Sequence, residues 1–524
     1  MTALELIRAG FPEACRPWPR FSLLPAEWAA LAARLAEDPA PVLLGLWADT
    51  QQVHALFRDR DGALIASVAV EGGRYPALST ARPVASRFER MIRDLWGHAA
   101  TGAGDERTWL DHGRWPLAHP LSPRPGLPGG TVEPPAFGVA EEQGVMQVPI
   151  GPVHGLIEEP AHLRLVARGH TVLRAEARLG YAHRGILALM RGKSPRTAAR
   201  FVARLAAEST VAHSVAFARA TEAALDTPAP LRAATVRVVM LLQERVAGHL
   251  DDLARLADAA GLVQLDAALG QQREFLLRAA EQAFGHRLMM DVVMPGGLAA
   301  DIASGGAAAI GEACDALEAA LPLLRRRLDP LLGRLDGVGV IPAAAAADSN
   351  RAGDRVHRHP GESGDVNHMG PRLCGDDGGA APSADGHASK PPATSKSPGT
   401  GANPVPLRLL RSVTGDAAAR CRARLTEIDG SLERLRDALD GLPEGPISAT
   451  LPADSGEGLA SAGSVRGTIW HWLRLDHGQI ADAFPCDPGW MLWPLAEAAI
   501  ANGPAEEETM IRLSCGLPCA ALDL

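Results

Sequence analysis

The histidine at residue 162 stands in a segment where an imidazole could move a proton. It follows Glu158, Glu159 and Pro160 in a polar turn between two predicted strands. Because histidine titrates near neutral pH and can both donate and accept a proton, His162 suits proton delivery to a bound molecule that is being reduced. A surface-loop histidine without a chemical role is the alternative, and the residues alone leave it open.

A second segment combines a histidine and an arginine, His183 and Arg184, two residues after Tyr181. Arginine stays charged even when it is largely buried, so Arg184 could hold an anion or raise the potential of a nearby iron-sulfur cluster. The alternative for Arg184 is an ion-paired structural arginine at a strand-to-helix junction.

A third candidate, His213, lies in a predicted helix over residues 197–222, with Phe217 four residues later on the same face. A lone histidine on an apolar face is often a core residue, and that alternative stays open. The sequence contains no nucleophile-base pair, glycine-rich phosphate loop or metal-ligand cluster. The histidines within residues 357–387 are too irregularly spaced for a defined metal site.

The elements that precede these candidates predict a small α/β domain over residues 1–120. Short apolar runs between residues 41 and 70 are separated by the Asp-Arg-Asp-Gly segment 59–62, which is a hairpin signal. Residues 84–96 have the periodicity of an amphipathic helix. Seven prolines between Pro116 and Pro135 then indicate a linker, assigned to residues 121–140.

The candidates themselves fall in a second domain, predicted in two parts. Its first part, residues 141–342, opens with strand-like runs and turns strongly helical from residue 197, which predicts a helical bundle. Residues 343–404 are rich in Gly, Ser, Ala and Pro and predict a disordered insert. The second part, residues 405–524, carries a helical pattern over 417–442 and a strand over 467–475. The fold class predicted is α+β.

Composition places the chain among soluble globular proteins. The 524 residues exceed one ordinary core, and 47% hydrophobic residues, 22% charged residues and a net charge of -9 give no nucleic-acid surface. Seven scattered cysteines argue against a disulfide framework or a structural zinc site and indicate cytosolic thiols. Since no leader or membrane-spanning run is evident, we expect membrane contact only through partner subunits.

The order of these segments resembles one superfamily. Gly151-Pro-x-His, Pro160-x-His-x-Arg-Leu, Gly180-Tyr-x-His-Arg-Gly and a terminal Asp487-Pro-x-Trp-x-x-Trp-Pro resemble the large subunits of energy-converting nickel-iron hydrogenases and the quinone-site (D-type) subunit of complex I. Residues 87–97 and 109–116 resemble the small (C-type) subunit of complex I, fused ahead of it. The resemblance implies a hydrogenase large-subunit-like domain with a central helical bundle and a peripheral β-sheet.

Roles for the candidates follow from that resemblance. His162 matches the quinone-site histidine of the family, and His213 stands where hydrogenases have a histidine and complex I a tyrosine. Both are therefore expected to be catalytic residues. Arg184, with His183, matches the arginine near the terminal iron-sulfur cluster, which a separate small subunit holds.

Departures from the family argue against a bound nickel-iron centre. Ala206 and Ser209 occupy the first expected cysteine pair, Leu522 follows Cys519 in the second, and Cys515 has the wrong spacing. Nickel and iron of low valence need soft thiolate ligands, so we predict no metal. The segment 463–467 also lacks an expected proton-relay carboxylate. The insert suggests a local reading-frame error or a degenerate gene segment.

The resemblance implies an oxidoreductase subunit of a complex I-like, hydrogenase-related membrane complex. It would pass electrons from the iron-sulfur cluster of a partner small subunit to quinone, on the cytoplasmic face of the inner membrane, beside antiporter-like membrane subunits. Without a Gly-x-Gly-x-x-Gly segment after a strand, any NAD would be bound by other subunits. The alternatives are a non-catalytic scaffold subunit and a true nickel-iron hydrogenase large subunit.

Overall fold

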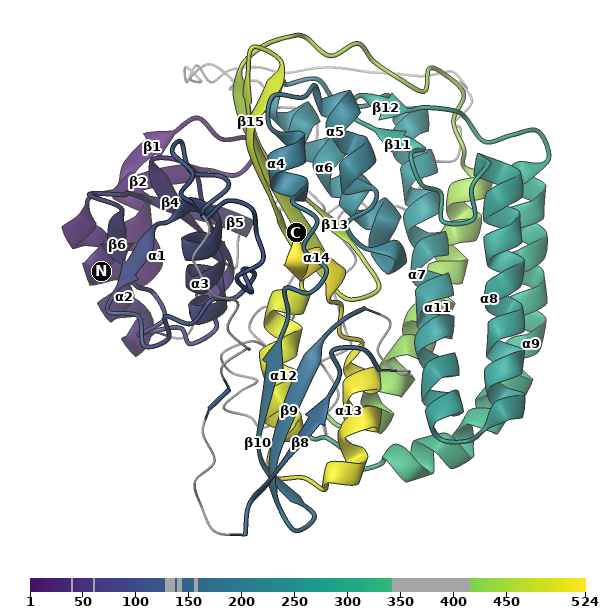
Figure 1. Cartoon of the computed structure of the whole chain (residues 1–524). Coiled ribbons are helices and arrows are strands. Elements are labelled where there is room, and N and C mark those ends of the chain that lie inside the picture. Colours follow the sequence, from purple (N-terminus) through teal and green to yellow (C-terminus); the bar gives the residue numbers. More distant parts are fainter. Residues whose placement is uncertain (39–40, 60–61, 128–136, 139–143, 155–158, 342–414) are drawn as a thin grey trace, which may run out of the picture.

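The computed structural model describes residues 1–524 except 39–40, 60–61, 128–136, 139–143, 155–158 and 342–414 (Figure 1). The predicted disordered insert and much of the predicted linker therefore lie outside the described residues. Among the helices that are described, none combines the length and the apolar character needed to cross a membrane. The mixture of helices with several small sheets agrees with the predicted α+β class.

The N-terminal part is built on a five-stranded sheet in the order β1-β2-β5-β4-β3. Its strands are β1 (Phe11–Glu13), β2 (Arg20–Leu23), β3 (Val42–Ala48), β4 (Gln52–Asp59) and β5 (Gly62–Ala69). Its helices are α1 (Ala3–Arg8), α2 (Pro25–Glu37) and α3 (Ala85–Trp96), and a short parallel pair joins β6 (Arg74–Pro76) to β7 (Ala99–Thr101). Asp59 pairs with Gly62, which confirms the predicted hairpin, and α3 confirms the predicted helix.

Two antiparallel three-stranded sheets follow in the larger part of the molecule. One contains β8 (Met146–Ile150), β9 (His162–Arg168) and β10 (Thr171–Arg178), close to the strands predicted there. The other contains β13 (Gly456–Gly463), β14 (Thr468–Asp476) and β15 (Gln479–Cys486). A two-stranded ribbon joins β11 (Val293–Met294) to β12 (Gly297–Leu298).

Long helices form the predicted bundle. They are α6 (Thr210–Ala224), α7 (Leu231–Ala259), α8 (Val263–Phe284), α9 (Gly306–Leu335) and α11 (Ala417–Asp440). The predicted apolar face of α7 is buried, with Val236, Val239 and Met240 fully inaccessible. On α8, however, Phe275 is 37% exposed although Leu276 and Ala279 are buried, so the predicted face begins one residue later.

The predicted helix over residues 197–222 is in fact interrupted. Helix α5 (Pro195–Val202) ends before a turn that contains the short 3-10 helix η1 (Ala207–Ser209), and α6 begins at Thr210. The Thr210 hydroxyl donates to the carbonyl oxygens of Ala203 and Ala206, a bonding pattern that stabilises this turn. Local periodicity could not predict the break, because Ala206 and Glu208 are compatible with a helix.

The sheet β13-β14-β15 lies directly on α6 because β13 carries two glycines. A Cβ atom on Gly456 would stand 2.3 Å from the Ala224 carbonyl oxygen, and one on Gly458 would stand 2.0 Å from the Ala220 carbonyl oxygen. Any side chain at either position would collide with the backbone of α6.

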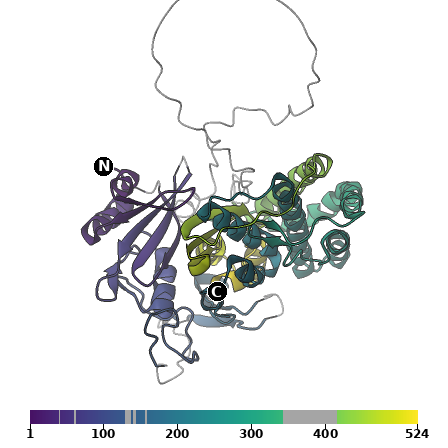
Figure 2. The same cartoon turned by 90° about the horizontal axis from the view of Figure 1, so that it is seen from above.

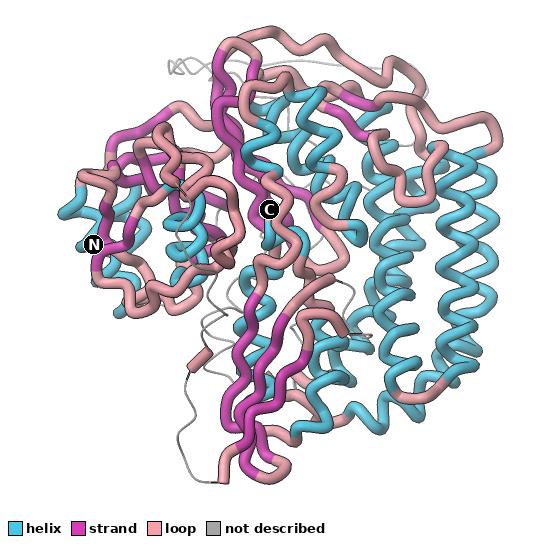
Figure 3. Tube along the Cα trace, in the orientation of Figure 1, coloured by secondary structure: helices cyan, strands magenta, loops and turns pink. Residues whose placement is uncertain are grey.

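The remaining short helices are α4 (Ile186–Met190), α12 (Gly489–Ile500), η2 (Ala505–Glu507), α13 (Glu508–Cys515) and α14 (Ala520–Asp523). Figure 1 shows the N-terminal part at the left, α7, α8 and α9 at the right, and α12, α13 and α14 between them. Figure 2 shows the same order from above, and Figure 3 shows that strands concentrate in the left and central regions.

Candidate functional site

The loop between β10 and α4 carries His183 and Arg184 and binds the C-terminal residues. The Asp523 carboxylate accepts hydrogen bonds from the backbone N–H groups of Gly180 (2.7 Å) and Ala182 (2.8 Å). His183 Nδ1 donates to the Asp523 carbonyl oxygen at 2.6 Å. Segments about 340 residues apart in the sequence therefore meet at this loop.

Arg184 is exposed, but its guanidinium is held by backbone carbonyl groups. It donates to the carbonyl oxygens of Arg204 (2.6 Å) and Leu205 (2.7 Å), next to the turn that contains η1. Two backbone carbonyl groups therefore orient the guanidinium, whose charge also acts on the nearby carboxylates of Glu159 and Asp523. Burial lowers the pKa of His183, so that imidazole is neutral at pH 7; its ring lies 4.5 Å from that of Trp115, tilted by 30°.

His213 belongs to a buried network within the core. Its Nδ1 lies 3.0 Å from His471 Nε2, and its Nε2 lies 3.3 Å from a carboxylate oxygen of Asp487. All three residues are at most 2% exposed. Burial and the neighbouring His213 lower the pKa of His471 well below its usual value, so His471 is neutral. His213 lines neither of the two cavities that lie beside η1.

His162 is the first residue of β9, at the strand end rather than within a turn. Its ring packs edge-on against Phe137 at 4.7 Å, and its Nε2 is buried without a hydrogen-bond partner among the described residues. Burial and the charges of Arg164 and Arg178 lower its pKa. The structure therefore does not bring His162 and His213 to one cavity, and neither shares a contact with Arg184.

Two adjoining cavities lie beside the turn that contains η1. The larger has a volume of about 320 Å3 and lies between η1, α7 and α8. The smaller has a volume of about 50 Å3 and reaches Trp493 and Cys519. Glu159, Glu208 and Arg466 line both cavities, so these three side chains form the boundary between them.

Glu159 joins this boundary to the C-terminal residues. Its carboxylate accepts hydrogen bonds from the backbone N–H groups of Cys519 (3.1 Å) and Ala520. Burial nevertheless raises the pKa of Glu159, while Arg184 lowers it. In the sequence, Glu159 stands out only as a neighbour of His162 in a polar turn, because its partners lie about 360 residues away.

A buried ion triad of Asp252, Arg424 and Arg466 lies next to this boundary. The Asp252 carboxylate on α7 accepts from Arg424 Nε on α11 at 2.9 Å and from the guanidinium of Arg466 in the β13–β14 loop. The pKa of Asp252 is about 2, because the two guanidinium groups outweigh the cost of burial. The segment 463–467 lacks its own carboxylate, as the sequence indicated, but Asp252 supplies one from α7.

The donor set at these cavities does not fit a nickel-iron centre. Among the described residues, Cys519 is the one cysteine that lines either cavity, and burial raises the pKa of its thiol well above the usual value, so it is not a thiolate. Within the same part of the chain, no group of three histidine, cysteine or carboxylate side chains is placed to hold a metal ion. Nickel and iron of low valence require several soft sulfur ligands, which Ala206, Ser209 and Leu522 do not supply.

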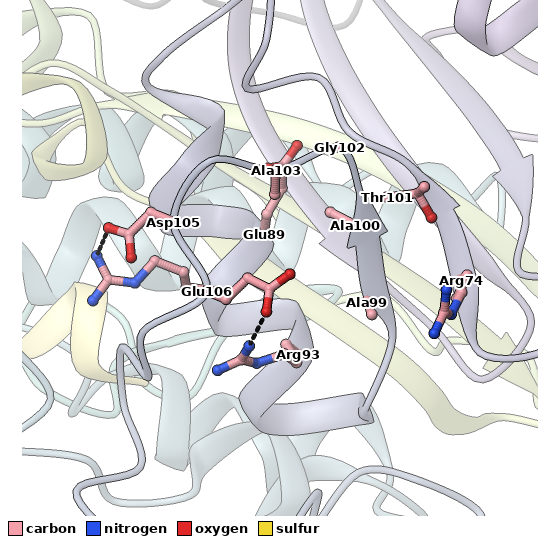
Figure 4. Close-up of a pocket in the computed structure, with 11 residues that line it drawn as sticks. Arg74, Glu89, Arg93, Ala99, Ala100, Thr101, Gly102, Ala103, Asp105 and Glu106 are labelled. Atoms are coloured by element: carbon pink, nitrogen blue, oxygen red, sulfur yellow. Dashed lines mark hydrogen bonds and ion pairs between the residues drawn. The ribbon is translucent and has the colours of Figure 1, made fainter.

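A third cavity, of about 300 Å3, lies in the N-terminal part between α3 and β7 (Figure 4). Charged groups of both signs line it, and Arg93 approaches Glu106 across it at 4.0 Å. Glu89 on its wall accepts from the backbone N–H groups of Leu78 and Ser79. These contacts hold the loop before α3, and none of the segments proposed for redox or proton chemistry reaches this cavity.

Comparison with known proteins relates two segments of the chain to two families. Residues 184–256 match the family model "Nickel-dependent hydrogenase", and residues 261–372 match "Respiratory-chain NADH dehydrogenase, 49 Kd subunit". Both ranges begin after residue 183, so the likeness of residues 87–97 and 109–116 to a small complex I subunit stays a prediction.

Curated relatives extend over more of the chain. Formate hydrogenlyase subunit 5 of Escherichia coli is 24% identical over 83% of this chain and 74% of that protein. Carbon monoxide-induced hydrogenase of Rhodospirillum rubrum is 26% identical over 62% of this chain and 84% of that protein. An NADH-quinone oxidoreductase subunit of Rhizobium etli is 26% identical over 58% of this chain and 69% of that protein.

A solved structure shares the fold. It is a chain from the membrane-bound sulfane sulfur reductase, an archaeal respiratory membrane complex, with a TM-score of 0.60 and 19% identity over 74% of this chain and 100% of that chain. The matches confirm the resemblance seen in the segments that begin at Gly151 and Gly180. The chain therefore contains one segment that matches the nickel-dependent hydrogenase family and one that matches the respiratory-chain 49 kDa subunit family, and the proteins similar to it are oxidoreductase subunits.

Proposed function

We propose that this chain is the acceptor-reducing subunit of a complex I-like membrane complex that works without a nickel-iron centre. Electrons from an iron-sulfur cluster in a partner small subunit pass to a quinone-like acceptor. The supporting observation is the pair of adjoining cavities whose boundary is Glu159, Glu208 and Arg466. Acids and a guanidinium stand there, near positions where a hydrogenase would require thiolates.

Arg184 has the position and charge that we expect of a residue beside the iron-sulfur cluster of the partner subunit. Its guanidinium is exposed, and the carbonyl oxygens of Arg204 and Leu205 fix its direction. A fixed positive charge beside an iron-sulfur cluster favours the reduced state and so raises its potential. His183, neutral and bonded to the Asp523 carbonyl oxygen, holds the loop in place.

We assign different roles to the two histidines. His162 has an unpartnered Nε2 and a lowered pKa, so at the start of β9 it can relay protons from water toward the site where the acceptor is reduced. His213 is enclosed by His471 and Asp487 and acts as a positioning residue, because it ties α6 to β14 and to the start of α12. The acceptor does not touch His213 in this assignment.

In the proposed assembly, this chain stays on the cytoplasmic face of the inner membrane and is held there by antiporter-like membrane subunits. The support is the relationship to subunits of membrane-bound respiratory complexes. Affinity purification of the chain from its native membrane, with identification of the subunits that accompany it, tests this. Recovery of the chain without any iron-sulfur subunit would contradict the electron-transfer proposal and favour a scaffold subunit.

The reaction itself is tested in the purified complex with decylubiquinone as acceptor. We expect R184A and H162A each to lower the rate of quinone reduction about tenfold or more, since each loses a charge or a proton carrier at the site. The matched controls are R196A and H170A, which remove exposed residues of the same types. Full activity of R184A and H162A, or nickel bound in proportion to the chain, would overturn the proposal.

A further inference from the structure

Glu208 occupies the middle of the turn in which the resemblance to hydrogenases expects a cysteine pair. It lies in η1, between Ala206 and Ser209. Its side chain lines both cavities, and its carboxyl group accepts a hydrogen bond from its own backbone N–H. No described side chain bonds to this carboxyl, so its remaining positions can bond to a ligand in either cavity.

The charges around Glu208 come from every element packed against it. Arg466 of the β13–β14 loop favours the ionised form of Glu208, whereas Glu159 before β9 and Asp487 before α12 disfavour it. Glu244 on α7 is also close, because Glu208 raises the pKa of Glu244. The further charged residues that line the two cavities are Asp251, Asp252, Arg255, Arg273, Arg287 and Arg512. With burial as the largest cause, the pKa of Glu208 is about 7.

Two buried polar atoms on the wall of the larger cavity lack a partner. Gln243 is 1% exposed, and its Nε2 donates to the Leu276 carbonyl oxygen while its Oε1 has no hydrogen bond among the described residues. Arg466 is 7% exposed, and its Nε is likewise without a partner there. A buried acceptor and a buried donor left open on the wall of one cavity indicate a ligand that can accept and donate.

One side of the cavity wall is apolar. Leu276, Leu277 and Ala280 from α8 line it, together with Leu288 and Met289. The volume of about 320 Å3 is within the range of small-ligand sites. Arg273 and Arg287 also line the cavity, and their side chains are 37% and 41% exposed, so the cavity reaches the surface there. The cavity thus offers an apolar wall to a ring and a few polar atoms to its oxygen.

We propose that the larger cavity binds a quinone head group and that Glu208 donates a proton to its nearer oxygen. This rests on the proposed function and names its binding site and proton donor. The quinone takes two electrons from the partner's iron-sulfur cluster. The Glu208 O–H gives its proton to one oxygen and becomes a carboxylate, and water at the cavity mouth protonates the other oxygen. Glu208 then takes a proton from water, and the quinol donates a hydrogen bond to Gln243 Oε1 as it leaves.

The test compares E208Q with E312Q in the purified complex, with decylubiquinone as acceptor. Glu312 is an exposed glutamate on α9, so E312Q controls for the loss of one carboxyl. We expect E208Q to lower kcat about 100-fold at pH 7 with KM little changed, because a general acid contributes on that scale. Wild-type kcat should fall as pH rises through about 7, and the E208Q rate should lose that dependence. E208D should restore part of the rate.

Infrared titration of the full-length chain decides the protonation claim without turnover. Asp523 and Glu244 also have raised pKa values, of about 7 and about 8, so the band of Glu208 is obtained as the difference between wild type and E208Q. We expect this difference to show the carbonyl stretch of a protonated carboxyl that is lost as pH rises through about 7, and the difference between wild type and E312Q to lack it. If wild-type complex reduces quinone and E208Q keeps both the rate and the pH profile, the role of Glu208 is wrong while the proposed function stands. If wild-type complex reduces no quinone although its cluster is reduced, the proposed function fails. An unchanged infrared band in E208Q would refute the protonation of Glu208 in either case.

Discussion

Single carboxyl groups inside this protein differ sharply in their affinity for protons, and their neighbours explain why. Asp252 has a pKa of about 2 because two guanidinium groups contact it. Asp523 has a pKa of about 7 although two backbone N–H groups donate to it, because burial there has no ion pair to oppose it. Glu208 resembles Asp523, since Arg466 directs its hydrogen bonds to Asp252.

The raised pKa of Glu208 predicts a loss of stability at alkaline pH. The folded chain holds a proton up to about pH 7, whereas the unfolded carboxyl releases it near pH 4.5. The contribution of Glu208 to the free energy of unfolding therefore falls by about 3 kcal/mol as pH rises from 4.5 to 7. Above pH 7 it stays constant. We expect E208Q to be more stable than wild type at pH 8 and nearly equal at pH 5, as measured by urea unfolding. Equal stability at both values would contradict the raised pKa.

Removal of His213 is expected to destabilise the chain, whatever it does to activity. H213A leaves the carboxylate of Asp487 and the ring of His471 buried without their shared partner, at a cost of about 2 kcal/mol. Thermal unfolding of H213A against H170A, which removes a side chain that is 93% exposed, checks this. A midpoint as high as that of H170A would show that the buried network does not stabilise the fold.

Elements with a clear local pattern were predictable from the sequence, and contacts between distant elements were not. Helix α3 and the β4–β5 hairpin follow from apolar periodicity and an Asp-Gly turn. The pairing of Asp252 with Arg466 joins residues 214 apart, and no local pattern encodes it. The site was found in part for the same reason: His183 and Arg184 lie in a recognisable segment, whereas Glu208 becomes significant only where two cavities meet.

At the scale of elements, Asp252 holds three of them together. It joins α7 to α11 through Arg424 and to the β13–β14 loop through Arg466. Removing one member of a buried ion cluster leaves uncompensated charge, so D252A is expected to lower the free energy of unfolding by about 3–5 kcal/mol. D258A, which removes an exposed aspartate from the same helix, is the control.

The pH dependence of this triad has the opposite sign to that of Glu208. Because the folded pKa of Asp252 lies below its ordinary value, its stabilisation is complete above about pH 4 and is lost as pH falls toward 2. Acid unfolding of D252A should therefore start from a lower stability and show a weaker dependence on pH in this window than D258A. Parallel acid unfolding curves would contradict the ion triad.

On the scale of the whole molecule, the N-terminal part packs on the sheet β13-β14-β15 through aromatic rings and ion pairs. Trp47 stacks on Phe484 at 5.5 Å and lies 5.5 Å from Trp472. Arg474 of β14 donates to Asp49 at 2.7 Å, and Arg20 pairs with Glu457 at 2.8 Å. The rings are buried and the ion pairs are at least partly buried, so separation of the two parts would expose both.

This interface predicts that the two parts unfold together. W47A creates a cavity between them and should lower stability by about 3–5 kcal/mol. Calorimetry should show one transition that moves to lower temperature as a whole. F11A, which removes a ring that is 65% exposed on β1, should leave it in place. Two separate transitions in the wild-type chain would show that the parts are independent.

The two glycines of β13 have a consequence for the imidazoles in the core. His471 faces Ala460 on β13, two residues beyond Gly458, and its distance from His213 on α6 depends on how closely that strand approaches the helix. A single methyl group at residue 458 would wedge the sheet outward, because the Ala220 carbonyl oxygen occupies its place. The close approach of these two rings therefore depends on the absence of a Cβ atom at Gly458 on the neighbouring strand.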